Sequence, residues 1–188
     1  MEKAKNNQKM EMKTSAKESG SINPMQAVKL EKVTLNCGAG TDAMKLERGL
    51  KLLNMLGEGE VKTTHSKHRI PAFGIRIGQE IGCKITLRGE KAKLLLKRLL
   101  EAVANKLSKK QISSGYFGFG IREYIEIPGV VYQRDIGILG LDVCVTLRKA
   151  GRRVVERKIK TGRIGNGQKI SQEETIKFME ENFKISIE

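Results

Sequence analysis

The short turn after the first apolar stretch of the chain has the residue types of a nucleotide-binding site. Gly38, Gly40 and Ala43 stand between a strand-like segment and a helix-like segment, and Glu60 follows about twenty residues later. In a dinucleotide fingerprint, glycines at such positions let the backbone approach a pyrophosphate at a helix N-terminus. The pattern would make the chain a nucleotide-binding enzyme that uses residues 38–43.

Two features of the sequence argue against that enzyme. The segment before the turn alternates polar and apolar residues, whereas the first strand of a doubly wound sheet is buried on both faces. No second strand–helix–strand unit follows. The same turn could instead bring backbone N–H groups at a helix N-terminus to an RNA phosphate, with Asn36, Gly38 and Gly40 as contacts. We prefer this interpretation and keep the enzyme as the alternative.

The histidines and cysteines are few and have spacings that could suggest metal or redox chemistry. His65 and His68 are the only histidines, and their spacing could be extended into a metal site with Cys83. In a basic, glycine-rich stretch, two histidines fit phosphate or base contacts, or solvent, better than a metal. We therefore expect neither a metal nor a cofactor.

The three cysteines lie far apart without CxxC spacing, which argues against a disulfide framework and for a reducing cytoplasm. Cys83 and Cys144 fall in strand patterns, where we expect them to be small buried hydrophobes. Phe117 and Phe119, in a GYFGFG segment, are expected in the core because aromatic residues form only 4% of the chain. We find no nucleophile–base pair, no paired carboxylates in a polar loop and no phosphate-binding P-loop motif.

Charge is the strongest signal in the composition. The 188 residues include 36 Lys and Arg against 21 Asp and Glu, a net charge of +15. A chain this basic attracts polyanions, so nucleic acid is the first partner to consider and an anionic membrane surface the second. No apolar run approaches the ~20 residues that span a bilayer, and the N-terminus lacks the apolar core of a secretory signal.

The basic residues are clustered. Residues 145–169 hold nine Lys and Arg and one Glu, a local charge of +8, and residues 61–91 hold seven Lys and Arg and two Glu, a local charge of +5. Residues 170–188 are acidic, with two Lys and five Glu. Two basic clusters on one small domain favour two RNA surfaces over one catalytic cleft. In the second half of the chain, the expected phosphate contacts are Arg152, Arg153, Arg157, Lys158 and Arg163.

The patterning predicts an α+β domain over residues 23–188 after a disordered tail over residues 1–22. We expect an antiparallel sheet of about five strands with helices packed on one face, in the order β-α-β-β-α-β-β-α. The predicted strands are 28–36 with a bulge, 61–67, 81–88, 117–127 and 141–147, and Val154 and Val155 are placed in a basic strand or hairpin arm. The predicted helices begin at a Thr41 cap and end at Gly57, cover 91–107, and run from a Ser171–Glu174 capping box to Phe183.

Two surfaces of this predicted domain lack a partner within the chain. Lys84, Thr86 and Arg88 alternate onto the sheet face away from the helices, which suits an RNA backbone or is merely solvated. Residues 68–80 form a long loop in which glycines and Pro71 alternate with isoleucines and arginines. Apolar and basic residues on such a loop indicate a partner outside the chain.

Four motifs, in order and spacing, resemble the fifth family of universal large-subunit ribosomal proteins, which carries 5S rRNA. They are EKVTLNCGAG, HRIPAFGIRIGQEIGCKITLRGEKA, GYFGFGIREYIEIPG and ILGLDVCVTL. The resemblance runs from about Pro24 to the C-terminus, and the region after Leu147 is similar to the archaeal and eukaryotic branch. It implies a cytoplasmic, non-enzymatic ribosomal protein in the central protuberance of the large subunit, beside other ribosomal proteins and between 5S rRNA and large-subunit rRNA.

The resemblance also implies roles for particular segments. Lys67 is expected to join the rRNA contacts named above. The loop over residues 68–80 is expected to reach the tRNA in the peptidyl site through Arg69, Phe73, Gly74, Ile75 and Arg76. The segment from Pro128 to Leu139 is expected to meet a small-subunit head protein in an intersubunit bridge, through Pro128, Gly129, Tyr132 and Arg134.

Overall fold

The computed structural model describes residues 23 and 25–187, and the predicted tail over residues 1–22 lies outside the described residues. Its centre is a six-stranded sheet in the order β2-β3-β1-β7-β6-β5. All five neighbouring pairs are antiparallel, which confirms the predicted α+β class. The strands are β1 Lys29–Gly38, β2 Val61–His65, β3 Glu80–Leu87, β5 Ile112–Ser113, β6 Tyr116–Ile121 and β7 Leu141–Arg148.

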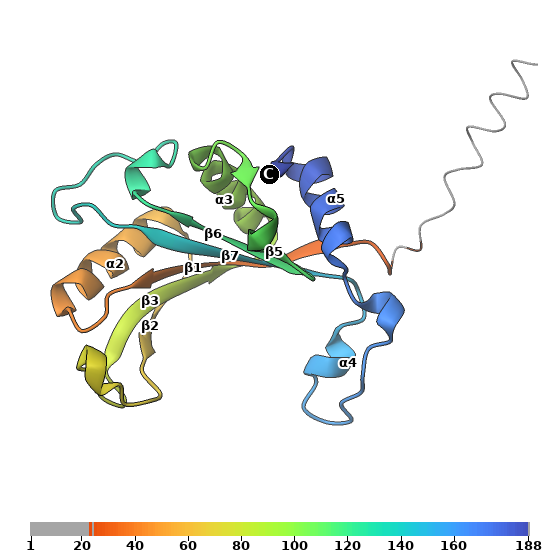
Figure 1. Ribbon diagram of the computed structural model, residues 1–188, viewed down its shortest axis with the longest axis horizontal. Coiled ribbons are helices and arrows are strands. Elements are labelled where there is room, and N and C mark those ends of the chain that lie inside the picture. Colours follow the sequence, from red (N-terminus) through yellow and green to blue (C-terminus); the bar gives the residue numbers. More distant parts are fainter. Residues whose placement is uncertain (1–22, 24, 188) are drawn as a thin grey trace, which may run out of the picture.

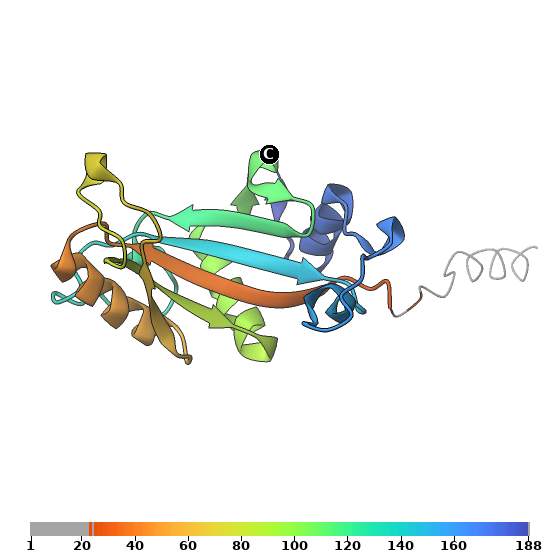
Figure 2. The same cartoon turned by 90° about the horizontal axis from the view of Figure 1, so that it is seen from below.

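Three helices cover one face of this sheet and leave the other face open (Figure 1). They are α2 Ala43–Leu56, α3 Gly89–Ala102 and α5 Gln172–Phe183. Two segments project from the opposite side: the loop between β2 and β3, and the stretch that contains the short helix α4 Arg153–Glu156. The view onto the open face shows these projections at opposite ends of the strands (Figure 2). A separate parallel pair joins β4 Lys106–Leu107 to β8 Ser186–Ile187.

The core lies between the sheet and the helices because the long strands alternate buried and more exposed residues over most of their length. On β1, Val33, Leu35 and Cys37 are buried while the residues between them are partly exposed. Helices α2 and α3 bring leucines onto this layer, among them Leu52 and Leu99, which are fully buried. The described residues therefore build one hydrophobic core.

Several boundaries agree with the sequence. The register between β1 and β7 shifts between Leu30 and Lys32, which confirms the predicted bulge. Helix α5 opens with the predicted capping box, in which the Ser171 hydroxyl accepts from the N–H of Glu174 and the Glu174 side chain accepts from the N–H of Ser171. Helix α2 ends at Gly57 as expected, but its cap is Asp42 rather than Thr41, because the Asp42 carboxylate accepts from two N–H groups of the first turn.

Three predicted elements are wrong in their extent or type. The helix predicted over residues 91–107 ends at Ala102, because Ala104 and Asn105 take left-handed backbone angles, and Leu107 is buried from strand β4 instead. The strand predicted over 117–127 ends at Ile121 and continues into a 3-10 turn at Tyr124–Glu126. Val154 and Val155 lie on α4, not on a strand.

None of the described helices is both long enough and apolar enough to cross a membrane.

Candidate nucleic-acid interface

The open face is defined here as the outward-pointing residues of the four longest strands and of β2. Pairing between the strands brings together two hydroxyls, since Thr34 Oγ1 and Thr86 Oγ1 lie 3.5 Å apart across β1 and β3. Lys84, Thr86 and Arg88 are exposed on this face, as the alternation predicted. Its members include Lys29, Lys32, Thr34 and Asn36 of β1, Lys62 and Thr64 of β2, Lys84 and Thr86 of β3 with Arg88 following, Tyr116, Gly118 and Gly120 of β6, and Asp142, Cys144, Thr146 and Arg148 of β7, so an acid, Asp142, also lies on this face, opposite Asn36.

Two pairs of like charges face each other directly across neighbouring strands of the open face. Lys62 of β2 is the cross-strand partner of Lys84 of β3, and Lys29 of β1 is the partner of Arg148 of β7. Like charges in directly opposite positions destabilise a sheet. Each pair has one acid near it, at 3.6 Å from Lys62 Nζ to Glu60 and at 4.0 Å from Arg148 to Glu31. The arrangement is suited to a polyanion, which would offset the repulsion. Lys29 and Lys62 were missed from the sequence because only the pairing register brings them opposite other cations.

Several N–H groups of the glycine turn already have hydrogen-bond partners within the chain. The N–H groups of Ala39 and Gly40 both donate to the carbonyl of Ile81, at 2.9 and 3.0 Å. At the start of α2 the Asp42 carboxylate already accepts from Met44 and Lys45. These hydrogen bonds leave fewer N–H groups for a phosphate, and the Asp42 carboxylate already lies at the helix N-terminus, so the phosphate contact of this turn stays a prediction. Asn36, Gly38 and Gly40 remain at the surface beside it.

The same turn excludes the dinucleotide fingerprint. The strand before it, β1, is antiparallel to both of its neighbours, whereas the fingerprint needs a parallel strand–helix–strand unit. Among the described residues, no group of three or more His, Cys, Asp and Glu is placed to hold a metal ion.

The prediction that Cys83 and Cys144 are buried is confirmed for Cys83 and wrong for Cys144. Cys144 is exposed on the open face, because it alternates with the buried Val143 and Val145. Cys37 and Cys83 are buried and pair directly across β1 and β3 under α2. A hydrogen bond with Cys37 and burial both raise the pKa of the Cys83 thiol, so it stays protonated.

The loop over residues 66–79 is held by its own backbone. Ser66 and Gly78 are joined through a backbone hydrogen bond of 2.9 Å, and Ile70 and Ile75 exchange two more at 3.0 and 3.1 Å. A 3-10 turn at Pro71–Phe73 closes at Gly74, whose left-handed backbone (φ 67°) favours glycine. The loop thus presents a fixed tip to the surroundings.

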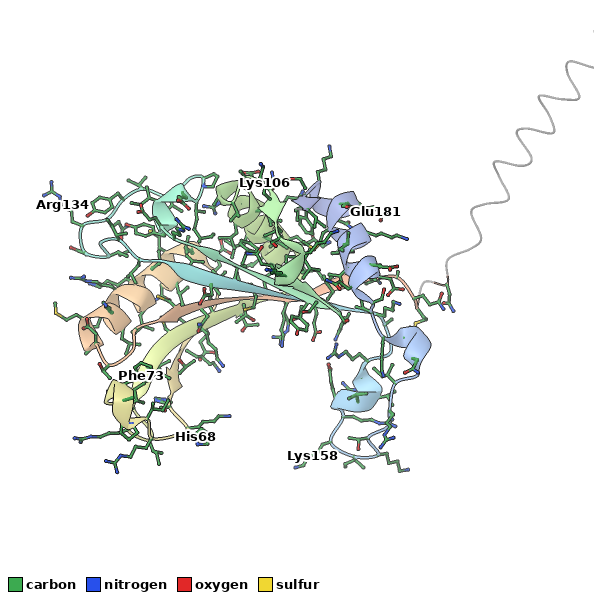
Figure 3. The ribbon with its side chains drawn as sticks, viewed as in Figure 1. His68, Phe73, Lys106, Arg134, Lys158 and Glu181 are labelled. Carbon is green, nitrogen blue, oxygen red and sulfur yellow. The ribbon has the colours of Figure 1, made fainter. Side chains whose placement is uncertain are left out.

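The tip of this loop exposes both apolar and cationic groups. The side chains of Phe73 and Ile77 are each 72% exposed, which is unusual for large hydrophobic residues. Figure 3 shows Phe73 and His68 on this projection, well away from Lys158 on the other one. The remaining predicted residues are arranged around the tip: Lys67, Arg69, Gly74 and Arg76 are exposed and Ile75 is partly buried.

The second projection is the basic arm, defined as residues 148–169. Arg152, Arg153, Arg157, Lys158 and Arg163, the phosphate contacts expected from the sequence, are all exposed on it. Arg152 pairs with Glu156 at 3.4 Å along α4. Lys149 differs from the rest, because its side chain is buried and its Nζ lies 2.8 Å from Glu174 of α5. This hydrogen bond lowers the pKa of the Glu174 carboxyl.

The segment from Pro128 to Leu139 forms a third exposed surface, at the edge of the helix layer. Its start is tied to α3, because the Arg98 guanidinium donates twice to the carbonyl of Pro128, at 3.2 and 3.0 Å. Tyr124 holds the middle of the segment in place, because its hydroxyl accepts a hydrogen bond from the N–H of Gln133. Figure 3 shows Arg134 at the outer end of the molecule. Pro128, Gly129, Tyr132 and Arg134 are exposed.

The chain is similar to known proteins over most of its length. A family model described as ribosomal protein L5 matches residues 23–76, and a model of the C-terminus of the same ribosomal family matches residues 80–178. Three archaeal relatives carry the name large ribosomal subunit protein uL5. The Archaeoglobus fulgidus protein is 44% identical over 164 residues, covering 87% of this chain and 92% of its own length. The Methanosphaera stadtmanae protein is 42% identical, with 89% and 100% covered, and the Sulfolobus acidocaldarius protein is 38% identical, with 92% and 98% covered.

Proposed function

The chain belongs to the ribosomal protein L5 family, and we propose from this membership and from its open face that it binds 5S rRNA and large-subunit rRNA. It is a structural constituent of the large ribosomal subunit and not an enzyme. On this proposal it acts in the central protuberance of the cytoplasmic ribosome, among other large-subunit proteins. The rRNA crosses the open face between the loop over residues 66–79 and the basic arm.

The observation that carries this proposal is the pairing of like charges on the open face. Lys62 opposite Lys84, and Lys29 opposite Arg148, are unfavourable in the free protein and become favourable when phosphates lie between them. Thr34, Thr86 and Asn36 add hydroxyl and amide groups suited to the ribose 2′-OH. The contacts proposed from the sequence, at Lys67, Arg88 and the exposed cations of the basic arm, extend this surface on both sides.

The exposed tip of the loop over residues 66–79 supports a second contact, with the tRNA in the peptidyl site. Phe73 offers an apolar ring to a sugar or base surface, while Arg69 and Arg76 offer cations to the backbone. The loop does not need to order itself on contact, because its backbone hydrogen bonds are already formed. Its small apolar tip would give a weak and reversible contact, which a moving tRNA requires.

The surface from Pro128 to Leu139 supports the third contact, with a small-subunit head protein. It exposes Val131, Tyr132 and Ile138, with exposed fractions of 78%, 50% and 70%. An exposed patch of aromatic and apolar residues beside Arg134 has the composition of a protein–protein contact.

A titration with transcribed 5S rRNA at several salt concentrations tests the central part of the proposal. The logarithm of the association constant should fall steeply with the logarithm of salt, by roughly 0.7–0.9 per phosphate contacted. Arg88→Gln should reduce that slope by about one contact, whereas Lys97→Gln on α3, in the opposite layer, should leave it unchanged. An unrelated structured RNA of similar length serves as competitor. Salt-independent binding, or equal binding of the competitor, would contradict the proposal.

A further inference from the structure

The basic arm borders a cavity of about 600 Å³ that is open to solvent, beside the end of β7. Its walls come from four stretches of chain: the turn between β5 and β6, the end of β7 with the turn after it, helix α4, and the segment that returns from the arm to α5. The volume is in the range of roughly 300–1,000 Å³ that ligand sites occupy. Arg148, Arg152 and Arg163, which line it, are among the phosphate contacts proposed above, but its apolar wall and Gln168 have no role in those contacts.

Part of the cavity wall is apolar, although the arm is the most basic part of the chain. Val154 and Val155 line it and are 38% and 46% exposed, and Ile164 and Ile170 contribute further apolar surface. Gln168 also lines it, and its Oε1 is buried without a hydrogen-bond partner among the described residues. A buried amide oxygen without a partner is unfavourable. A small rotation of this amide would let it exchange hydrogen bonds with a polar ligand edge.

The charged residues that line the cavity are all basic. Its described lining residues include Arg148, Arg152, Arg163 and Lys169, and no Asp or Glu. Lys149 also lines it. Three of these cations have an acid near them: Lys149 pairs with Glu174, Arg152 pairs with Glu156 at 3.4 Å, and Arg148 lies 4.0 Å from Glu31, so most of the excess positive charge comes from Arg163 and Lys169. The ligand must therefore combine a negative charge with an apolar body and a polar edge, which is the chemistry of a nucleotide.

We propose that this cavity receives one unstacked base of ribosomal RNA, an inference that rests on the proposed function. The base faces lie against the valines, its edge meets the Gln168 amide, and Arg163 and Lys169 hold the adjoining phosphates. An RNA fits better than a free nucleotide because the arm continues beyond the cavity with exposed cations that a single phosphate would leave unused, at Arg153, Arg157 and Lys158. Residues 1–22 hold five Lys and three Glu, so their own charge makes them a poorer occupant.

Two glycines near the cavity offer a matched pair of variants. Gly165 lines the cavity and Gly167 does not. A Cβ atom on either would meet no described atom within 4 Å, and the Gly165 backbone (φ −60°, ψ 154°) accepts any residue. Gly165→Leu should therefore fill the cavity, while Gly167→Leu adds the same side chain two residues away.

The experiment uses the full chain with 5S rRNA and with large-subunit rRNA, probed with reagents that modify the Watson–Crick edges of unpaired bases. Gly165→Leu should bind one of these RNAs about tenfold more weakly than wild type, and Gly167→Leu should bind it like wild type. One nucleotide should be protected by wild type and by Gly167→Leu and reactive with Gly165→Leu. A general loss of affinity without such a nucleotide, or equal behaviour of the two variants, would overturn the proposal.

A second pair covers the case in which Gly165→Leu does not fold. Val155→Ala shortens the cavity wall without changing charge, and the control is Leu94→Ala, which shortens a 64% exposed side chain of α3 in the opposite layer. Only Val155→Ala should weaken binding and expose the same nucleotide. If deletion of residues 1–22 exposes the cavity valines in methyl spectra of the free protein, the tail is the occupant and the base proposal is wrong. Failure of wild type to bind either RNA would instead refute the proposed function.

Discussion

Lys149 Nζ lies 2.8 Å from Glu174 Oε1, in a contact that ties the root of the basic arm to helix α5. The lysine side chain is only 5% exposed, and its Nζ also donates to the carbonyl of Lys169 at 3.3 Å. Glu174 at the same time closes the capping box of α5. One carboxylate therefore fixes both the helix start and the position of the arm relative to the sheet.

Glu174→Gln should lower the free energy of unfolding by about 1–2 kcal/mol, because a buried ammonium loses its ionic partner; the partial exposure of Glu174 limits the loss. The lowered pKa of Glu174 predicts a pH signature. Stability from this pair is complete above the ordinary value of 4.5 and is lost as pH falls through the lower folded-state pKa. Melting curves of the wild type from pH 3 to 7 should show this loss of stability at the acid end of the range. Glu181→Gln, exposed on the same helix, is the control and should keep the acid-dependent loss.

Thr175→Val should cost about 1–3 kcal/mol of stability, although it conserves volume. The Thr175 hydroxyl is fully buried, donates to the carbonyl of Ser171 at 3.0 Å and accepts from the N–H of Gly115 at 3.2 Å. Valine would leave that N–H unpaired between α5 and the β5–β6 turn. Thr175→Ser should recover most of the loss in urea titrations. Equal losses for serine and valine would show that the methyl group, not the hydroxyl, matters.

Leu99→Ala should cost about 2–5 kcal/mol, because it opens a cavity under the centre of α3. The control is Leu94→Ala on the same helix, where the side chain is 64% exposed and the loss should stay within ~0.5 kcal/mol. Leu99 itself is fully buried. Chemical denaturation of both variants makes the comparison. Similar losses would contradict the one-sided packing of the helix.

Deleting residues 72–77 should leave the fold and 5S rRNA affinity unchanged, the latter within about twofold. The deletion removes the exposed tip but retains Ser66 and Gly78, which close the base of the loop. In reconstituted ribosomes the variant should retain peptidyl-site tRNA less well, and Phe73→Ala should show part of the same defect. A large loss of 5S rRNA affinity in the isolated variant would assign the loop to the 5S interface instead.

The sequence predicted those features that depend on local chemistry. The alternation of apolar and polar residues predicted the long strands, and the Ser171–Glu174 spacing predicted the start of α5. The bulge of β1 was predicted because its apolar residues change from one face of the strand to the other partway along it. The prediction failed where a helical stripe extended beyond its helix: Leu107 continues the apolar spacing of α3, but the left-handed Ala104 and Asn105 carry it into a strand. Periodicity cannot detect a backbone reversal inside an apolar pattern.

The sequence indicated which segments of the candidate interface are basic, but not which cations face one another across neighbouring strands. Charge clustering along the chain identified the two projections, since clusters are local. The opposition of Lys62 to Lys84 depends on which strands are neighbours and in what register, and neither follows from local spacing. For the same reason the sequence counted Lys149 among the available cations, although Glu174 from another element neutralises it.

Lys84→Gln tests the central claim most directly, because one substitution should move stability and RNA binding in opposite directions. Removing one charge of the Lys62–Lys84 pair relieves repulsion, so the free energy of unfolding at low salt should stay equal or rise by up to ~1 kcal/mol. The same variant should bind 5S rRNA more weakly, with a salt slope smaller by roughly 0.7–0.9. Lys97→Gln on α3 should change neither quantity. If Lys84→Gln binds 5S rRNA as tightly as Lys97→Gln and with the same salt slope, the open face is not the RNA surface.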